Sequence, residues 1–204
     1  MDELFESVKK RAKELGIRKI IVASSTGDSA KRAVGEMGTK EYEIIVVTDR
    51  AEVVWDVASW SKKEREEYEI SPGAKEHPSG IPYGSPVRKG LKDMRINWII
   101  QATEVFREIN VPGGCNVAQV IAQTLYLFGS GTKVAIEITL IACDAGAVKA
   151  GEDIIAIAGE NKGLNTALLL TAAHTDEFFG ISGPWAAKKP IQKLKVKEVI
   201  YKRD

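Results

Sequence analysis

Apolar positions along the chain follow two spacings, one helical and one continuous, and the two kinds of segment alternate. Residues 1–15 place apolar side chains three or four positions apart with charges between them, and Gly16 follows where helices commonly stop. Residues 19–23 form a short β-rich apolar run. A polar, glycine-containing turn and a second helical pattern at 29–37 come next. The sequence therefore opens as helix, strand, loop and helix.

The rest of the chain continues this alternation. The segment 132–145 is ambiguous, because its β-branched residues favour a strand while its length and the following Gly146 favour a buried helix; we predict the helix. Alternating strands and helices indicate a three-layer α/β/α fold with a mostly parallel sheet covered on both faces. The remaining predicted strands are 43–48, 96–100, 153–158, 167–171 and 196–201, and the remaining predicted helix is 116–128.

A long polar excursion, residues 49–93, interrupts the pattern. It contains Pro72, Pro78, Pro82 and Pro86 and a charged block at 62–69 that could form one solvent-facing helix. Connections of this length usually serve function, often as lids. No persuasive linker or repeat divides the chain, so we interpret residues 1–204 as a single domain with a variable excursion.

Composition narrows the choice of partners and compartment. Hydrophobic residues make up 44% and charged residues 28%, the balance of a folded globule. The formal net charge of +1 supplies no field for attracting nucleic acid or an anionic membrane. The longest nearly apolar stretch, 134–148, is too short for a bilayer that requires about 20 apolar residues. Two cysteines without a C-x-x-C pair suggest neither a disulfide framework nor a metal site, and a reducing cytoplasm fits best.

The first candidate binding site lies between the strand at 19–23 and the helix after it. Free amides and the positive end of a helix converge at such a turn, and hydroxyl groups add donors for phosphate oxygens. The alternative is an ordinary N-cap, in which Ser or Asp satisfies the helix's own amides. The residues concerned are Ser24, Ser25, Thr26, Gly27, Asp28 and Ser29.

The second candidate is the loop 159–166, which follows a predicted strand at the edge where open α/β sheets bind ligands. Neither G-x-x-x-x-G-K-[ST] nor a strand-linked G-x-G-x-x-G is present, which lowers support for Walker-type hydrolysis and ordinary NAD binding. The polar and glycine positions that we assign to the ligand here are Gly159, Asn161, Gly163, Asn165 and Thr166.

Several further polar residues could carry chemistry. Glu137 and Thr139 lie in the apolar segment 132–145 and must reach either a ligand or a structural partner, because buried polar groups are generally paired. His174 either caps a strand end or faces the pocket. Cys115 follows two glycines at a predicted helix start, so a cysteine-dependent hydrolase with His174 as base is an alternative function; a small buried hydrophobe is the plainer interpretation.

These motifs resemble the C-terminal, effector-binding domain of pyruvate kinases, and more closely archaeal proteins that consist of that domain alone. The resemblance rests on residues 22–30 (V-A-S-S-T-G-D-S-A), 135–146, 155–159 and 172–174, in that order. It covers about 1–48 and 95–204 by motif order, leaving 49–93 unmatched.

The resemblance implies a phosphorylated small molecule held between the two loops, with flavin mononucleotide (FMN) as our first choice of cofactor. A non-catalytic regulatory protein that binds a sugar phosphate is another alternative, although Asp28 stands where the family often has a basic residue. Pyruvate kinase activity is not expected, and any reaction stays open. The aromatic wall for a flavin is unassigned, with Trp185 or Phe179 as candidates. A homo-oligomer is left open.

Overall fold

A computed structural model describes residues 2–67, 70–107, 114, 116–160, 163–180 and 191–203. Its main sheet has six strands in the order β5-β2-β1-β6-β7-β8. The first four in that order run parallel, whereas β7 pairs antiparallel with both β6 and β8. The strands are β1 (Lys19–Ala23), β2 (Glu43–Thr48), β5 (Trp98–Gln101), β6 (Asp153–Ala158), β7 (Thr166–Thr171) and β8 (Lys195–Lys202).

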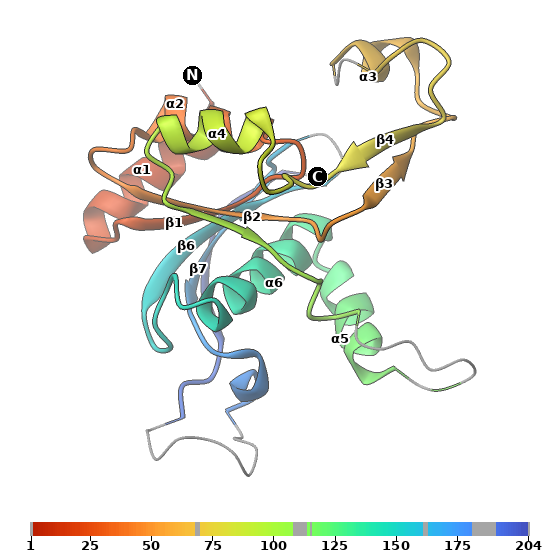
Figure 1. Cartoon of the computed structure of the whole chain (residues 1–204). Coiled ribbons are helices and arrows are strands. Elements are labelled where there is room, and N and C mark those ends of the chain that lie inside the picture. Colours follow the sequence, from red (N-terminus) through yellow and green to blue (C-terminus); the bar gives the residue numbers. More distant parts are fainter. Residues whose placement is uncertain are drawn as a thin grey trace.

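Helices cover both faces of this sheet, which gives three layers (Figure 1). The helices α1 (Glu3–Leu15), α2 (Asp28–Met37) and α4 (Pro86–Asp93) lie on one face. The helices α5 (Val117–Tyr126) and α6 (Ser130–Asp144) lie on the other, near the short 3-10 turn η1 (Thr175–Glu177). The predicted α/β fold with a mostly parallel sheet is confirmed.

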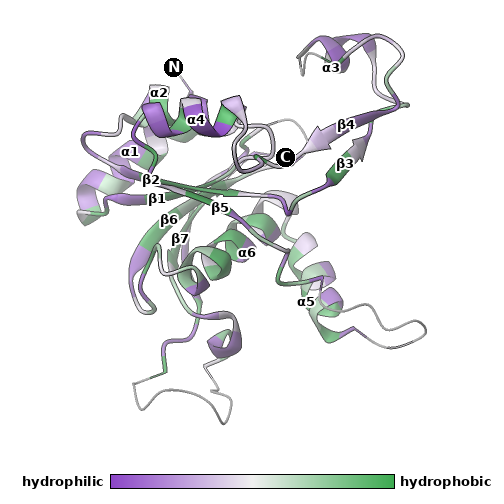
Figure 2. Ribbon diagram, viewed as in Figure 1, coloured by the Kyte–Doolittle hydropathy of each residue, from purple (hydrophilic) through white to green (hydrophobic). Residues whose placement is uncertain are grey.

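The core is divided by the sheet into two apolar clusters. Neighbouring residues of one strand face opposite layers, so Ile21 packs toward α6 while Ile20 and Val22 pack toward α1 and α2. Because both faces are covered, the central strands are apolar at nearly every position, as Figure 2 shows. That is why β1, β2 and β6 appear in the sequence as uninterrupted apolar runs.

The predicted elements outside the excursion are confirmed within a few residues. The first helix ends at Gly16, whose φ of 67° is the left-handed conformation favoured by glycine. The ambiguous segment 132–145 is helical up to Asp144, where α6 ends, and twelve of the fifteen residues of α6 are buried. Across the described residues, no helix is both long and apolar enough to span a bilayer.

The excursion 49–93 contains more structure than the sequence pattern indicated. Strands β3 (Val53–Asp56) and β4 (Glu76–Ser79) pair antiparallel and form an arm that projects from the sheet, with α3 (Lys62–Glu67) beyond it (Figure 1). The described part of the charged block, residues 62–67, forms the helix α3. The helix α4 was missed, although Ser85 caps it and Pro86 occupies its first turn, a typical start signal. Its Leu91 is fully buried in the core, so the end of the excursion is part of the fold.

Candidate functional site

A cleft of about 620 Å³ lies at the carboxyl edge of the parallel strands. Strand β1 pairs with β2 on one side and with β6 on the other, and α2 and α6 cover opposite faces of the sheet. The chain leaves β1 through α2 on one face of the sheet and enters β6 from α6 on the other face. The edge between β1 and β6 is therefore a topological switch point, the place where open α/β sheets bind ligands. The loop 24–29 and the β6–β7 loop both line the cleft there.

The loop 24–29 positions the start of α2 against the cleft. Ser24 is buried, and its Oγ accepts hydrogen bonds from the amides of Gly27 (3.1 Å) and Ala30 (3.2 Å). Ser24 therefore supplies the capping that α2 lacks from its N-cap Gly27. Among the described residues, no acceptor is bonded to the amides of Asp28 and Ser29, the first two residues of the helix. The N-cap interpretation is thus confirmed for Ser24, whereas two amides of the same loop have no described acceptor.

Gly27 does not line the cleft but allows α2 to pack closely against α4. Its φ of 102° is a conformation that L side chains rarely adopt, and an added Cβ would approach Val87 Cγ1 of α4 to 2.5 Å. The carboxylate of Asp28 is already occupied, because it accepts from Thr26 Oγ1 (2.7 Å) and from the Lys31 ammonium (3.2 Å). Arg32, one turn into α2, also lines the cleft and pairs with Asp2.

The lining has an apolar floor and two aromatic side chains. Trp55 comes from the β3–β4 arm and Tyr126 from the end of α5. Phe179, one of our two candidates for the aromatic wall, is 67% exposed beside η1 and does not line the cleft; Trp185 lies outside the described residues. The apolar floor consists of Ala23, Val47, Ala102, Val134, Ile138 and Ile141.

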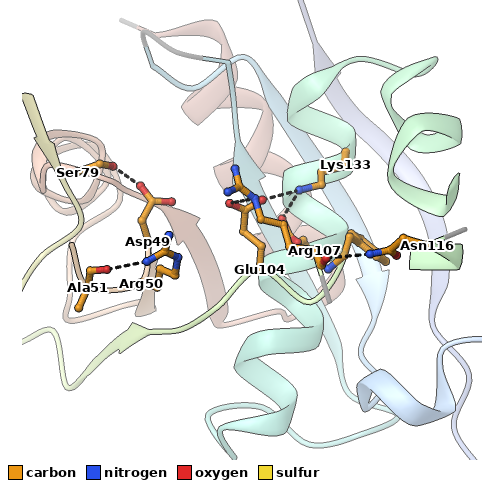
Figure 3. Close-up of polar contacts among 10 residues, drawn as sticks. Asp49, Arg50, Ala51, Ser79, Glu104, Arg107, Asn116 and Lys133 are labelled. Atoms are coloured by element: carbon orange, nitrogen blue, oxygen red, sulfur yellow. Dashed lines mark hydrogen bonds and ion pairs between the residues drawn. The ribbon is translucent and has the colours of Figure 1, made fainter. Parts of the chain in front are cut away.

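A chain of charged groups runs along the α6 side of the cleft. Lys133 Nζ lies 2.5 Å from Glu137 Oε2 and 3.3 Å from Glu104 Oε2, and Glu104 Oε1 lies 2.9 Å from Arg107 Nε. Figure 3 shows Glu104 and Arg107 beside Lys133, with Asp49 and Arg50 across the gap from them. Glu137 Oε1 accepts the amide of Phe106 at 3.2 Å. Every oxygen of Glu137 is therefore paired.

Burial and pairing act in opposite directions on the two ends of this ion pair. Burial raises the pKa of the Glu137 carboxyl, and Lys133 only partly offsets that rise. Burial would lower the pKa of Lys133, but the neighbouring carboxylates, Glu137 above all, outweigh it and leave the pKa raised. Lys133 is thus held as a cation in the cleft wall.

The β6–β7 loop closes the other side. At Gly159 an added Cβ would lie 2.7 Å from the carbonyl carbon of Gly163, so only glycine lets the two arms of the loop approach. Both glycines line the cleft, and Ser130 Oγ at the start of α6 donates to Glu160. Asn161 lies outside the described residues.

Besides Gly27, four predicted site residues do not line the cleft. Asn165 and Thr166 pack under the first turn of α6, where an added Cβ at Gly131 would collide with both. Thr139 is fully buried, and its hydroxyl donates to the carbonyl of Ala135 in its own helix at 2.8 Å. His174 follows β7, which runs antiparallel, and therefore lies at the opposite edge of the sheet. There its Nδ1 contacts Asp144 at the far end of α6, at 3.0 Å.

The structure gives no support to a cysteine nucleophile among the described residues. Cys115 lies outside them. Cys143 is buried, and burial raises the pKa of its thiol to about 12, so it is protonated at neutral pH. Its Sγ lies 3.7 Å from His174 Nδ1, but the same nitrogen faces Asp144, so the three do not form a relay through both ring nitrogens.

Sequence reasoning missed several residues that the fold brings into the cleft, namely Asp49, Trp55, Glu104, Arg107, Tyr126 and Lys133. Lys133 had a detectable signal, because a Lys four residues before Glu137 in an otherwise apolar helix is a marked pattern. Glu104, Arg107 and Trp55 come from connections whose path the sequence pattern does not fix. No cluster of three or more His, Cys, Asp or Glu suited to a metal ion occurs in the described part of the chain.

The architecture defines a doubly wound α/β domain with a ligand-sized cleft at its switch point. A comparison with known families agrees: the model for the pyruvate kinase alpha/beta domain matches residues 2–170. The chain therefore belongs to the pyruvate kinase alpha/beta domain family. The bounds of the match enclose the excursion 49–93, whose last helix, α4, packs into the core.

Proposed function

We propose that this protein binds a phosphate-bearing small molecule, with the phosphate at the start of α2 and the rest of the ligand on the apolar floor of the cleft. FMN is the first candidate. The observation that carries the proposal is the pair of amides at Asp28 and Ser29, which open the helix at one end of the cleft without described acceptors. Helix starts of this kind favour anions.

The charges around the cleft restrict where an anion can bind. Because the carboxylates outnumber the cations five to three, a phosphate is favoured only where local donors converge. The start of α2 meets this condition: Arg32 lies one turn away, and the hydroxyls of Ser25 and Ser29 line the same end. The lining carboxylates are Asp28, Asp49, Glu104, Glu137 and Glu160, and the lining cations are Arg32, Arg107 and Lys133.

The body of the cleft suits a flat, partly apolar group. Its volume lies within the range of about 300–1,000 Å³ that small-molecule sites occupy. Trp55 and Tyr126 offer ring surfaces to a planar ligand, and the aliphatic floor excludes water from its face. A flavin, which joins a planar ring system to a phosphate tail, fits this division.

The first experiment is a calorimetric titration of the apo-protein with FMN, riboflavin and ribose 5-phosphate. We expect riboflavin to bind at least ~10-fold more weakly than FMN, because it lacks the anchoring phosphate. Equal affinity for the two flavins would remove the phosphate from the proposal. Binding of ribose 5-phosphate without FMN binding would instead favour the alternative function, a regulatory protein that binds a sugar phosphate.

A matched pair of variants tests the location. Thr26→Asp places a carboxylate at the mouth of the anion site, while Thr26→Asn has nearly the same shape without the charge. We expect Thr26→Asp to weaken FMN about tenfold or more relative to Thr26→Asn. Equal affinities for folded samples of both variants would place the anion elsewhere.

A further inference from the structure

The buried ion pair between Lys133 and Glu137 is costly for a purely structural element. Both side chains are only 4% exposed, and removing two charges from water costs several kcal/mol per ion, which their attraction repays only in part. Buried pairs can often be replaced by apolar residues of similar size without loss of stability. A pair placed in the wall of a ligand-sized cleft therefore calls for an explanation beyond folding.

Counting donors shows what the pair offers to a ligand. A lysine ammonium has three N–H donors. Lys133 uses one toward Glu137 Oε2 and one toward Glu104 Oε2, and the third has no oxygen acceptor among the described residues. Each oxygen of Glu137 already accepts a hydrogen bond, one from Lys133 and one from the amide of Phe106. The ammonium also lies 5.6 Å from the centroid of the Tyr126 ring and 5.8 Å from that of Phe106. Because Lys133 lines the cleft, its third N–H is a charged donor that a ligand oxygen could accept there.

We propose that Lys133 is a second recognition point, which donates a hydrogen bond to a neutral carbonyl oxygen on the ligand body. The proposal rests on the proposed function, because it takes a phosphate-bearing ligand in the same cleft as given. The ligand class that follows is a phosphate ester whose ring carries a carbonyl group, as flavins and pyrimidine nucleotides do.

The local charge balance selects a neutral carbonyl over a second anion. Lys133 and Arg107 supply two positive charges, and Glu104 and Glu137 supply two negative ones, so the network is neutral as a whole. A second anion on the ligand would meet two carboxylates within 3.3 Å of the ammonium. A carbonyl dipole gains the charged hydrogen bond without that repulsion.

The test compares two probes on three variants by calorimetry. FMN carries the phosphate and the ring carbonyls, whereas ribose 5-phosphate carries the phosphate alone. Lys133→Met removes the donor but leaves the Glu137 carboxylate buried without its cation. The double variant Lys133→Met/Glu137→Gln is therefore tested as well, because Gln is neutral and can still accept the Phe106 amide. Lys197→Met is the control: it removes a lysine from an ion pair with Asp153 at the opposite edge of the sheet.

We expect the double variant to bind FMN about tenfold more weakly while its affinity for ribose 5-phosphate changes less than about twofold. Lys197→Met should match the unmodified protein with both probes. Unchanged FMN affinity in the double variant would overturn the role of Lys133 and leave the phosphate site intact. Equal losses for both probes would overturn it as well, because they would indicate a structural effect.

The unmodified protein separates this inference from the function on which it rests. FMN binding no tighter than ribose 5-phosphate would refute a second recognition point while the phosphate site stands. Failure of both probes to bind would refute the proposed function and this inference together.

Discussion

Gly131, the second residue of α6, should behave opposite to an ordinary helical glycine. Replacing a helical glycine with alanine usually stabilises a protein by about 0.5–1 kcal/mol, because alanine restricts the unfolded chain. At Gly131 the new Cβ would come within 2.6 Å of both Asn165 Oδ1 and the Cβ of Thr166. Thr166 begins β7, which lies between β6 and β8 in the sheet, and Asn165 immediately precedes it. Since α6 and β7 are both anchored in the core, neither can move away cheaply.

We therefore expect Gly131→Ala to destabilise the protein by about 1–3 kcal/mol, the usual cost of overpacking. Gly35→Ala is the matched control, because Gly35 lies inside α2 and an added Cβ there meets nothing within 4 Å. That variant should gain up to about 1 kcal/mol. Urea unfolding followed by circular dichroism measures both free energies of unfolding. A gain in stability for Gly131→Ala would refute the close packing of α6 on the β6–β7 loop.

Three further predictions concern the core and its edges. Leu140→Ala removes a fully buried side chain of α6 and should cost about 2–5 kcal/mol of unfolding free energy in the same assay. In a Cys115→Ser background, Cys143 should resist a thiol reagent at pH 7.5 and react fully in urea, because burial raises its pKa to about 12; rapid labelling of the native protein would contradict this. The pKa of Asp153 is lowered, because its hydrogen bonds to Lys197 and Thr171 outweigh its partial burial. Asp153→Asn should therefore lower the free energy of unfolding by a few tenths of a kcal/mol at pH 7 and leave it unchanged at a pH below that lowered pKa.

The layers of the fold could be predicted because β1, β2 and β6 are buried on both faces and therefore appear as continuous apolar runs. Helix α6 could be predicted from length, since the apolar segment 132–145 is longer than an ordinary strand. Helix α4 could not be recognised as readily, because its eight residues bury only Arg88 and Leu91 and leave a weak pattern. The burial of Arg88 could not be predicted from the local sequence, because its guanidinium donates to the carbonyls of Ile81 and Ile99, which the tertiary fold brings near it.

The candidate site divides in the same way. The loop 24–29 was recognisable because a strand, a glycine turn and a helix follow one another within a few residues. His174 was misplaced because β7 runs antiparallel, which carries its end to the opposite edge of the sheet. Thr166 and Asn165 belong to the correct loop but support α6 instead of lining the cleft. Glu104 and Trp55 enter only through the paths of long connections, which depend on packing rather than on local pattern.

The last prediction concerns the pH dependence of the Lys133→Met variant. Losing the ammonium leaves Glu137 facing Glu104 and the Phe106 amide only, so the pKa of Glu137, already raised by burial, should rise further above its ordinary value of 4.5. A carboxyl whose pKa is higher in the folded state binds protons more tightly when folded, so stability falls as the pH rises from 4.5 through the folded-state value. Removing one partner of a buried pair costs about 3–5 kcal/mol when the other is left charged.

We therefore expect Lys133→Met to be clearly less stable than the unmodified protein at pH 8 and to recover part of the difference at pH 5, with urea unfolding measured at both. The double variant Lys133→Met/Glu137→Gln has no carboxyl at this position, so its stability relative to the unmodified protein should lack the recovery on acidification. An equal loss for Lys133→Met at both pH values would mean that the pKa of Glu137 is not raised in the folded variant. Such a result would contradict the burial of Glu137 on which the second recognition point depends.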